Sequence, residues 1–248
     1  MIYRGVIVSD RFRLVSWEEC RPVKVQLNRI NQKMYSYMNS NCKELLFDAE
    51  LVGSGKRGLV TARIGGNQGF DFDYNLVIDP PEGFTYNPDA VKQIFMDALN
   101  YAIQGTGYSY ASDSTRAMTI KVIDTENSRI VHSCDYAIVY YLDDGYYYLH
   151  NNKINGSNYS FNYRQLKYPV EDMEQFIIDN SKDGHAWIRE KYLQLKNADK
   201  QDKQSYVLYI EALYAIINEI RQYHQSSEED ADDQDDDYRF PLQSSVWT

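Results

Sequence analysis

Residues 70–78, with the sequence FDFDYNLVI, place two aspartates inside a run that is otherwise typical of a buried β-strand. Side chains two positions apart on a strand point to the same face, so Asp71 and Asp73 project together while Phe72 and Tyr74 point to the other face. Two adjacent carboxylates repel each other, and burial makes their charge more unfavourable, so a cation between them would stabilise the pair. The alternative is that both simply face solvent on a half-exposed strand.

The composition predicts a globular chain. Its 248 residues, 43% hydrophobic and 14% aromatic, suffice for one large domain or two small ones. No stretch approaches the roughly 20 continuous apolar residues that span a bilayer, and residues 1–17 alternate apolar and charged side chains, unlike a signal peptide. We therefore expect no membrane partner and a cytoplasmic location. Cys20, Cys42 and Cys134 are too widely spaced for a disulfide framework or a zinc site.

The formal net charge of −10 is concentrated near the C-terminus. Residues 228–237 hold eight of the 36 acidic residues, which leaves residues 1–227 with 28 acidic and 25 basic side chains. We expect residues 226–248 to form a disordered tail, either solubilising or partner-binding, because they have few apolar residues and much like charge. No strong nucleic-acid footprint is expected, because phosphate contacts need clustered Lys and Arg.

Hydrophobic periodicity predicts an α+β chain. Short apolar runs predict strands at 44–54, 70–78, 117–124, 128–143 and 145–152. Helical spacing predicts helices at 16–40, 87–103, 171–181, 185–197 and 204–224. The first helix has a possible capping box at Ser16 and Glu19 and a possible interruption near Pro22. We therefore expect a core over residues 1–165, a helical segment over 166–225, and the acidic tail.

Three further features favour a phosphate site beside the aspartate pair. The preceding strand ends at Gly53 and Ser54, a turn of small residues where backbone N–H groups and a hydroxyl can approach a phosphate closely. Asp135 lies in another apolar strand, which could bring a third carboxylate beside the first two. Basic side chains that could neutralise a polyphosphate lie near these loops in the sequence: Lys56, Arg57, Arg63 and Arg116.

These residues resemble the signature of the polymerase β-like nucleotidyltransferase superfamily. That signature is a hydrophobic residue, Gly, then Gly or Ser, followed on the next strand by Asp-hydrophobic-Asp/Glu-hydrophobic. Here residues 52–54 are similar to the first part, residues 71–74 to the second, and Asp135 to the carboxylate added from a later strand. The 16 residues between Ser54 and Asp71 exceed the usual spacer, so the intervening loop holds an extension.

The long helix before the turn and the helical segment after the strands are most similar to one branch of that superfamily. This branch contains cyclic GMP-AMP synthase, the bacterial dinucleotide cyclases and the oligoadenylate synthases. The resemblance implies a nucleotidyltransferase-fold mixed sheet flanked by helices, with a C-terminal helical segment. It also implies a role in bacterial defence.

The resemblance implies a metal-dependent enzyme. Asp71, Asp73 and Asp135 are the implied catalytic residues and ligands of Mg²⁺, or Mn²⁺. Such ions would position a nucleoside triphosphate such as ATP for transfer of its nucleoside monophosphate to a hydroxyl acceptor, with release of pyrophosphate. The acceptor stays open: a second nucleotide, an RNA end, a protein side chain or a small molecule.

Further nucleotide-binding residues are implied around these carboxylates. Gly53 and Ser54 are expected to bind the terminal phosphates, with Lys56 and Arg116 as additional cations. In the cyclase branch a Lys and a Ser of the helical part also hold the triphosphate, and their implied counterparts here are Lys191 or Lys196, with Ser205. The other interpretation of the two lysines is the solvated basic face of an amphipathic helix.

A second function class is a catalytically inactive module on the same fold. Such an antitoxin-like or regulatory protein would bind a nucleotide or a partner through its helices and acidic tail. A degenerate copy would be expected to lose at least one of the three carboxylates. Each of the three has a candidate in this sequence, which favours the enzyme.

Overall fold

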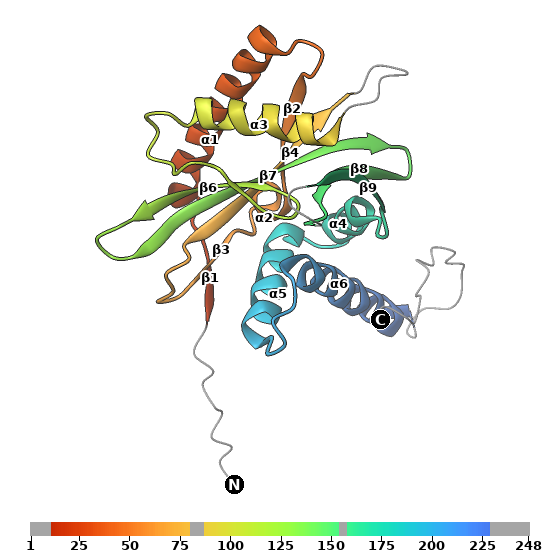
Figure 1. Ribbon diagram of the computed structural model, residues 1–248. Coiled ribbons are helices and arrows are strands. Elements are labelled where there is room, and N and C mark those ends of the chain that lie inside the picture. Colours follow the sequence, from red (N-terminus) through yellow and green to blue (C-terminus); the bar gives the residue numbers. More distant parts are fainter. Residues whose placement is uncertain (1–10, 80–86, 154–157, 229–248) are drawn as a thin grey trace.

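The computed structural model describes residues 11–79, 87–153 and 158–228 (Figure 1). The strands are β1 (Phe12–Leu14), β2 (Phe47–Val52), β3 (Thr61–Arg63), β4 (Phe70–Ile78), β5 (Ser112–Asp113), β6 (Met118–Asp124), β7 (Arg129–Leu142), β8 (Gly145–Asn151) and β9 (Tyr159–Gln165). The helices are α1 (Trp17–Asn41), α2 (Gly53–Arg57), α3 (Pro88–Ala102), α4 (Val170–Asp179), α5 (Gly184–Ala198) and α6 (Ser205–Glu228). The predicted α+β class is confirmed.

The main sheet is mixed. Its strand order is β2-β4-β7-β6-β5, with β8 paired to β7 and β9 paired to β8. Strands β4 and β7 are parallel, whereas β2 and β6 run antiparallel to their neighbours β4 and β7. A separate two-stranded sheet joins β1 to β3. The aspartate-bearing strand β4 therefore lies between β2 and β7, in the interior of the main sheet.

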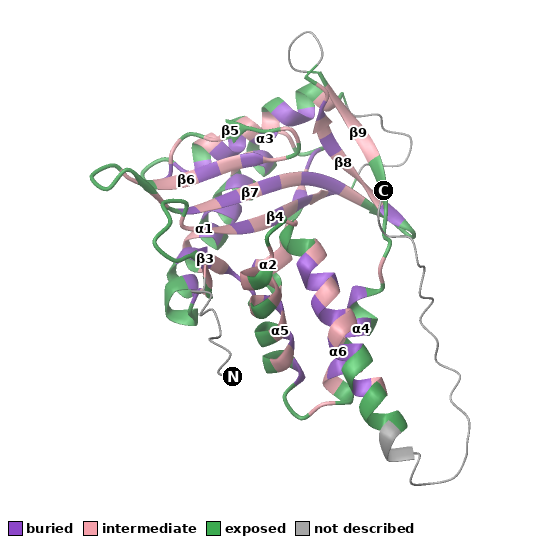
Figure 2. Ribbon diagram, turned by 90° about the horizontal axis from the view of Figure 1, so that it is seen from below, coloured by how far each residue is buried: buried purple, intermediate pink, exposed green. Residues whose placement is uncertain are grey.

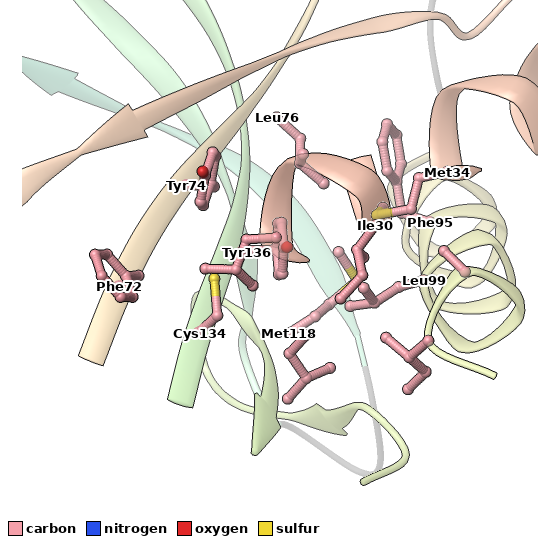
Figure 3. Packing of buried hydrophobic residues seen from close by; sticks show 14 of the residues in the cluster. Ile30, Met34, Phe72, Tyr74, Leu76, Phe95, Leu99, Met118, Cys134 and Tyr136 are labelled. Atoms are coloured by element: carbon pink, nitrogen blue, oxygen red, sulfur yellow. The ribbon is translucent and has the colours of Figure 1, made fainter. Parts of the chain in front are cut away.

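Helices α1 and α3 cover one face of the main sheet (Figure 1). Alternate side chains of β4 are buried on this face, as the sequence pattern predicts. Figure 3 shows members of this cluster from four of the elements: Phe72, Tyr74 and Leu76 of β4, Tyr136 of β7, Ile30 and Met34 of α1, and Phe95 and Leu99 of α3. This apolar layer fixes the orientation of β4 and therefore which of its side chains face the opposite side.

The ends of the two covering helices follow from local sequence. Ser16 and Glu19 form the capping box expected for α1, with the Ser16 hydroxyl accepting from the Glu19 N–H. The predicted interruption near Pro22 does not occur, because buried residues on both sides of the proline hold one continuous helix against the core. In α3, the Asn87 side chain caps the first turn and Pro88 occupies the position where a missing N–H costs nothing.

Helices α4, α5 and α6 lie on the other side of the sheet and have their own apolar cluster (Figures 1 and 2). The predicted C-terminal helical segment is thus confirmed, and its expected start at residue 166 falls between β9 and α4. Helix α6 extends to Glu228, so residues 226–228 of the expected tail are helical. The rest of that tail lies outside the described residues. No described helix combines the length and hydropathy required to cross a membrane.

The structure also contains elements that the sequence pattern did not indicate. The segment between Ser54 and Asp71, expected as an extended loop, holds most of the short helix α2 and the strand β3. Strand β9 pairs with β8 along its whole length, although its side chains are mostly half-buried or exposed. Helix α2 is the element that matters for the site, because it begins at Gly53.

Candidate active site

The parallel pairing of β4 with β7 brings the three predicted carboxylates together. Asp73 pairs with Asp135 and Asp71 pairs with Ser133, so all three aspartates face the side of the sheet opposite α1 and α3. One oxygen from each of Asp71, Asp73 and Asp135 lies within 4.8 Å of the others. This separation matches a group of carboxylates around one or two cations.

Burial and mutual repulsion make the ionised carboxylates of this cluster unfavourable unless a cation is bound. Burial, with a smaller contribution from the charge of Asp135, raises the pKa of Asp71 to about 7 and that of Asp73 to about 6. Asp71 Oδ1 is buried and has no hydrogen-bond partner among the described residues. Carboxylate oxygens are the ligands that hard divalent cations such as Mg²⁺ prefer. The three residues therefore fit a divalent metal ion, which would replace the missing partner of Asp71.

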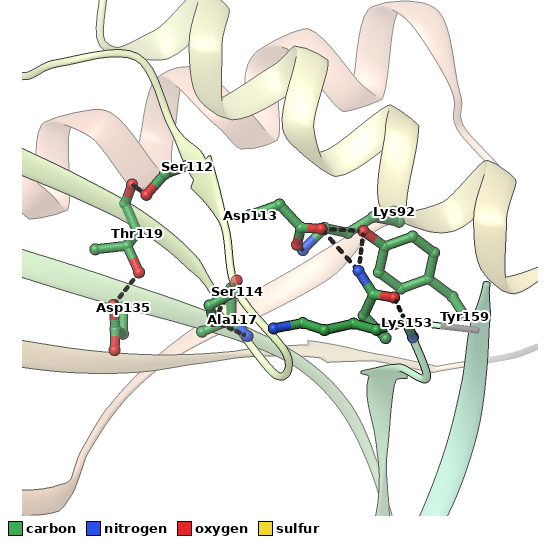
Figure 4. A network of polar contacts seen from close by, with 10 residues as sticks. Lys92, Ser112, Asp113, Ser114, Ala117, Thr119, Asp135, Lys153 and Tyr159 are labelled. Atoms are coloured by element: carbon green, nitrogen blue, oxygen red, sulfur yellow. Dashed lines mark hydrogen bonds and ion pairs between the residues drawn. The ribbon is translucent and has the colours of Figure 1, made fainter. Parts of the chain in front are cut away.

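A neighbouring strand orients the third carboxylate. Thr119 of β6 pairs with Asp135 of β7, and its hydroxyl donates a hydrogen bond to Asp135 Oδ1 (Figure 4). Thr119 was not anticipated from the sequence. The available signal was the pairing of two consecutive antiparallel strands, which places their residues opposite each other.

The small-residue turn lies directly against the cluster. Val52 at the end of β2 pairs with Asp73, so the chain enters α2 at Gly53 beside that carboxylate. Gly53 has φ +59°, and a Cβ added there would lie 2.9 Å from Asp73 Oδ2. The backbone conformation therefore favours glycine at this position, and a larger residue would also have to displace the Asp73 carboxylate.

A cavity of about 370 Å³ opens between the turn, the carboxylates and the helical segment. Its walls come from α2, β3, β4, α5 and α6 and from the loop after α2. The lining residues are Gly53, Ser54, Arg57, Leu59, Thr61, Asp71, Asp73, Tyr192, Lys196, Ser205, Tyr206 and Tyr209. The volume lies within the range of sites for small ligands and cofactors.

Two of the residues expected from the helical segment meet at this cavity. Lys196 Nζ donates to Ser205 Oγ at 2.9 Å, and both side chains line the cavity. Lys191, also expected as a phosphate ligand, instead pairs with Glu219 of α6 and is not among the lining residues. The rotation of α5 about its axis therefore places Lys196, and not Lys191, at the cavity.

The two additional cations expected in the core lie elsewhere. Lys56 is exposed, whereas its neighbour Arg57 lines the cavity. Arg116 is exposed and lies over the ring of Tyr148, with 5.3 Å from its guanidinium carbon to the ring centroid. Neither Lys56 nor Arg116 is a lining residue, so the structure brings neither of them to the carboxylates.

Comparisons with known proteins identify structures with a similar fold but no protein with a similar sequence. No protein-family model matches the sequence, and no curated protein matches it significantly. The fold is similar to that of DncV from Vibrio cholerae. The GTP-bound form has a TM-score of 0.61 and 11% identity, covering 90% of this chain and 77% of DncV.

Two further DncV structures agree. The cyclic AMP-GMP synthase DncV in complex with the linear intermediate pppA(3′,5′)pG has a TM-score of 0.59 and 11% identity, with 87% of this chain and 75% of DncV covered. The 3′-deoxy ATP-bound form has a TM-score of 0.56 and 12% identity, with 87% and 74% covered. The chain therefore has the fold of DncV, which agrees with the mixed sheet flanked by helices and the C-terminal helical segment that the sequence resemblance implies.

Proposed function

We propose that this protein is a metal-dependent nucleotidyltransferase, which moves a nucleoside monophosphate from a nucleoside triphosphate to a hydroxyl acceptor and releases pyrophosphate. The observation that carries the proposal is the convergence of three carboxylates within 4.8 Å beside the Gly53–Ser54 turn and a cavity. The fold shared with DncV, whose structures hold GTP, 3′-deoxy ATP and a linear dinucleotide, makes purine nucleotides the first substrates to test.

The residues of the site divide the work of this reaction. Asp71, Asp73 and Asp135 would hold divalent ions such as Mg²⁺, which when bound supply positive charge to the triphosphate and to the attacking and leaving oxygens. The Ser54 hydroxyl and the backbone N–H groups of its turn would bind the terminal phosphates. Lys196 lies across the cavity, where its ammonium group can neutralise the triphosphate.

Transfer requires the acceptor and the leaving group to lie in line. The acceptor hydroxyl gives up its proton to solvent and its oxygen bonds to the α-phosphorus, as the bond from that phosphorus to the bridging oxygen of the β-phosphate breaks and pyrophosphate leaves. The chain contributes by holding both partners in that geometry. Tyr206, which lines the cavity and is 43% exposed, offers a ring on which the base can stack.

The test is pyrophosphate release from each labelled nucleoside triphosphate in the presence of Mg²⁺ or Mn²⁺. We expect Asp73→Asn and Asp71→Asn each to lower the rate by about 10³-fold or more, because loss of a metal ligand removes several kcal/mol of transition-state stabilisation. Asp48→Asn, an exposed aspartate on β2, is the matched control and should leave the rate unchanged.

Two outcomes would contradict the proposal. Release that persists in both Asp71→Asn and Asp73→Asn would place the chemistry at another site. Nucleotide binding without pyrophosphate release, with every nucleotide and both metals, would favour the inactive regulatory module instead.

A further inference from the structure

Arg57 occupies one wall of the cavity and is already paired with an acid. Its Nε donates to Glu174 Oε1 of α4 at 2.8 Å, and its guanidinium carbon lies 4.9 Å from the ring centroid of Tyr209 of α6. The Tyr209 hydroxyl donates to the same Glu174 oxygen. Arg57 therefore connects the turn of the core to two helices of the helical segment.

Arg57 lies close to the turn that the proposed function assigns to the terminal phosphates. Arg57 belongs to α2, three residues after Ser54, and of the lining residues in the described chain only it and Lys196 are basic. A guanidinium carries five N–H donors in a planar fork that matches phosphate oxygens. Within the described residues, Arg57 uses Nε toward Glu174 and Nη1 toward the Gly53 carbonyl at 3.5 Å.

We propose that Arg57 binds the terminal phosphate of the nucleotide, and that Glu174 is an internal competitor holding the guanidinium when no nucleotide is bound. The inference rests on the proposed function, since it places the triphosphate on the Gly53–Ser54 turn. A phosphate there would attract Arg57 and repel the Glu174 carboxylate, because hydrogen bonds between a guanidinium and a phosphate are charge-assisted.

The exchange has a consequence beyond affinity. In the absence of nucleotide, the Glu174 carboxylate ties α4 to α6 through Tyr209 and to α2 through Arg57. When Arg57 turns to a phosphate, Glu174 loses its hydrogen bond from Arg57 and keeps the one from Tyr209. Nucleotide binding is thereby coupled to the contact between the core and the helical segment.

The test measures binding of inorganic tripolyphosphate in the presence of Mg²⁺ by titration calorimetry. This probe has a terminal phosphate and no base, so it requires neither turnover nor knowledge of the preferred nucleotide. We expect Arg57→Ala to weaken binding about 10- to 100-fold, the range for a lost hydrogen bond to a charged group. Glu174→Gln, which keeps a hydrogen-bonding oxygen toward Arg57 and Tyr209, should tighten binding about threefold or more as the competing charge is removed.

Removal of any nearby negative charge would also favour an anion, so the matched control is Glu171→Gln. Glu171 is exposed on the same helix and interacts electrostatically with Arg57 without sharing its hydrogen bond. We expect a change within about twofold, as for exposed charges. In the double variant Arg57→Ala/Glu174→Gln, the gain from Glu174→Gln should disappear, because it acts through Arg57.

Several results would overturn the inference: tripolyphosphate binding unchanged in Arg57→Ala, equal gains in Glu174→Gln and Glu171→Gln, or a gain that survives in the double variant. Thermal unfolding of each variant identifies loss of fold, and if Arg57→Ala does not fold, the comparison of Glu174→Gln with Glu171→Gln decides alone. The two proposals fail separately. Absence of pyrophosphate release leaves this binding pattern intact, whereas active protein with unchanged binding in these variants removes only the role of Arg57.

Discussion

The two faces of β4 show how one strand serves both folding and the site. On the face covered by α1 and α3, Phe72 and Leu76 are 0% exposed and belong to the apolar core. On the opposite face, Asp71 and Asp73 are half-buried, with pKa values raised to about 7 and about 6. The first face stabilises the fold, and the second stores an unfavourable charge arrangement that a bound cation would relieve.

The two faces of β4 therefore separate the residues that stabilise the fold from the residues of the candidate site. Strongly perturbed carboxylates in a cavity mark a functional site more often than a structural one, because a site selected only for stability would not keep such residues together. The rigid apolar face is what makes the arrangement possible. It holds the backbone of β4 and β7 in register, so that repulsion between the carboxylates cannot separate them.

The largest stability effect should come from the apolar face. We expect Leu76→Ala to lower the free energy of unfolding by about 2–5 kcal/mol, because it leaves a cavity in a fully packed layer. Denaturant unfolding measures this loss. Val77→Ala, the next residue on the other face and only half-buried, is the control and should cost clearly less. Equal losses would mean that the two faces do not differ as described.

On the face that carries the aspartates, a substitution is expected to raise the free energy of unfolding. The folded-state pKa of Asp71 lies above the free-aspartate value of 3.8, so its destabilising effect is absent below about pH 4, grows through the range up to about 7, and is complete above it. In metal-free buffer at pH 8, Asp71→Asn should therefore raise the free energy of unfolding by about 2–4 kcal/mol.

The stabilisation expected for Asp71→Asn should depend on pH and on bound metal, and both dependences serve as controls. At pH 4 the variant and the unmodified protein should differ little in stability. Addition of Mg²⁺ at pH 8 should raise the melting temperature of the unmodified protein more than that of the variant. For the unmodified protein this rise should be smaller at pH 6 than at pH 8, because the ion competes with protons for the carboxylates. A variant that is less stable than the unmodified protein at pH 8 without metal would contradict the charge arrangement on this face.

The smallest effect should follow from the residue that orients Asp135. Thr119→Val removes the hydroxyl that donates to Asp135 Oδ1 while keeping the shape of the side chain. We expect about a tenfold loss of activity or metal affinity with little change in stability, as for other residues that position metal ligands. Ser112→Ala is a suitable comparison, because that hydroxyl donates to the Thr119 carbonyl and not to a carboxylate. Equal effects of the two substitutions would remove the special role of Thr119.

Much of the sheet could be predicted because local pattern and tertiary environment agree there. The predicted strand at 70–78 coincides with β4, since its alternation reflects one face that is buried in the core. The third carboxylate was reachable from the sequence because Asp135 also lies inside a strongly apolar strand. Strand β9 could not be predicted, because its exposed and half-buried side chains show no clear hydrophobic alternation. Its strand conformation depends instead on hydrogen bonds to β8.

The cations around the site were the least predictable part. Lys56 and Arg57 are neighbours in one helical turn, and Lys191 and Lys196 lie on one helix, so proximity in sequence could not choose between the members of either pair. The choice depends on how α2 and α5 are rotated relative to the cavity. In α2 that rotation buries Gly55 against Leu51 and Phe72, and in α5 it buries Ile188 and Tyr192. Most of the packing partners lie far from these helices in the sequence.

The sequence by itself determined the chemistry available: a pair of aspartates on one face of a strand, a third on another strand, and a Gly-Ser turn before them. These follow from the strand period of two and from the conformational freedom of glycine, both of which are local properties. Only the tertiary structure decided that Asp135 lies opposite Asp73, that Arg57 and Lys196 face the cavity, and that Glu174 holds Arg57. Contacts of this kind depend on strand register and helix packing, which are fixed by the whole core and not by any short segment.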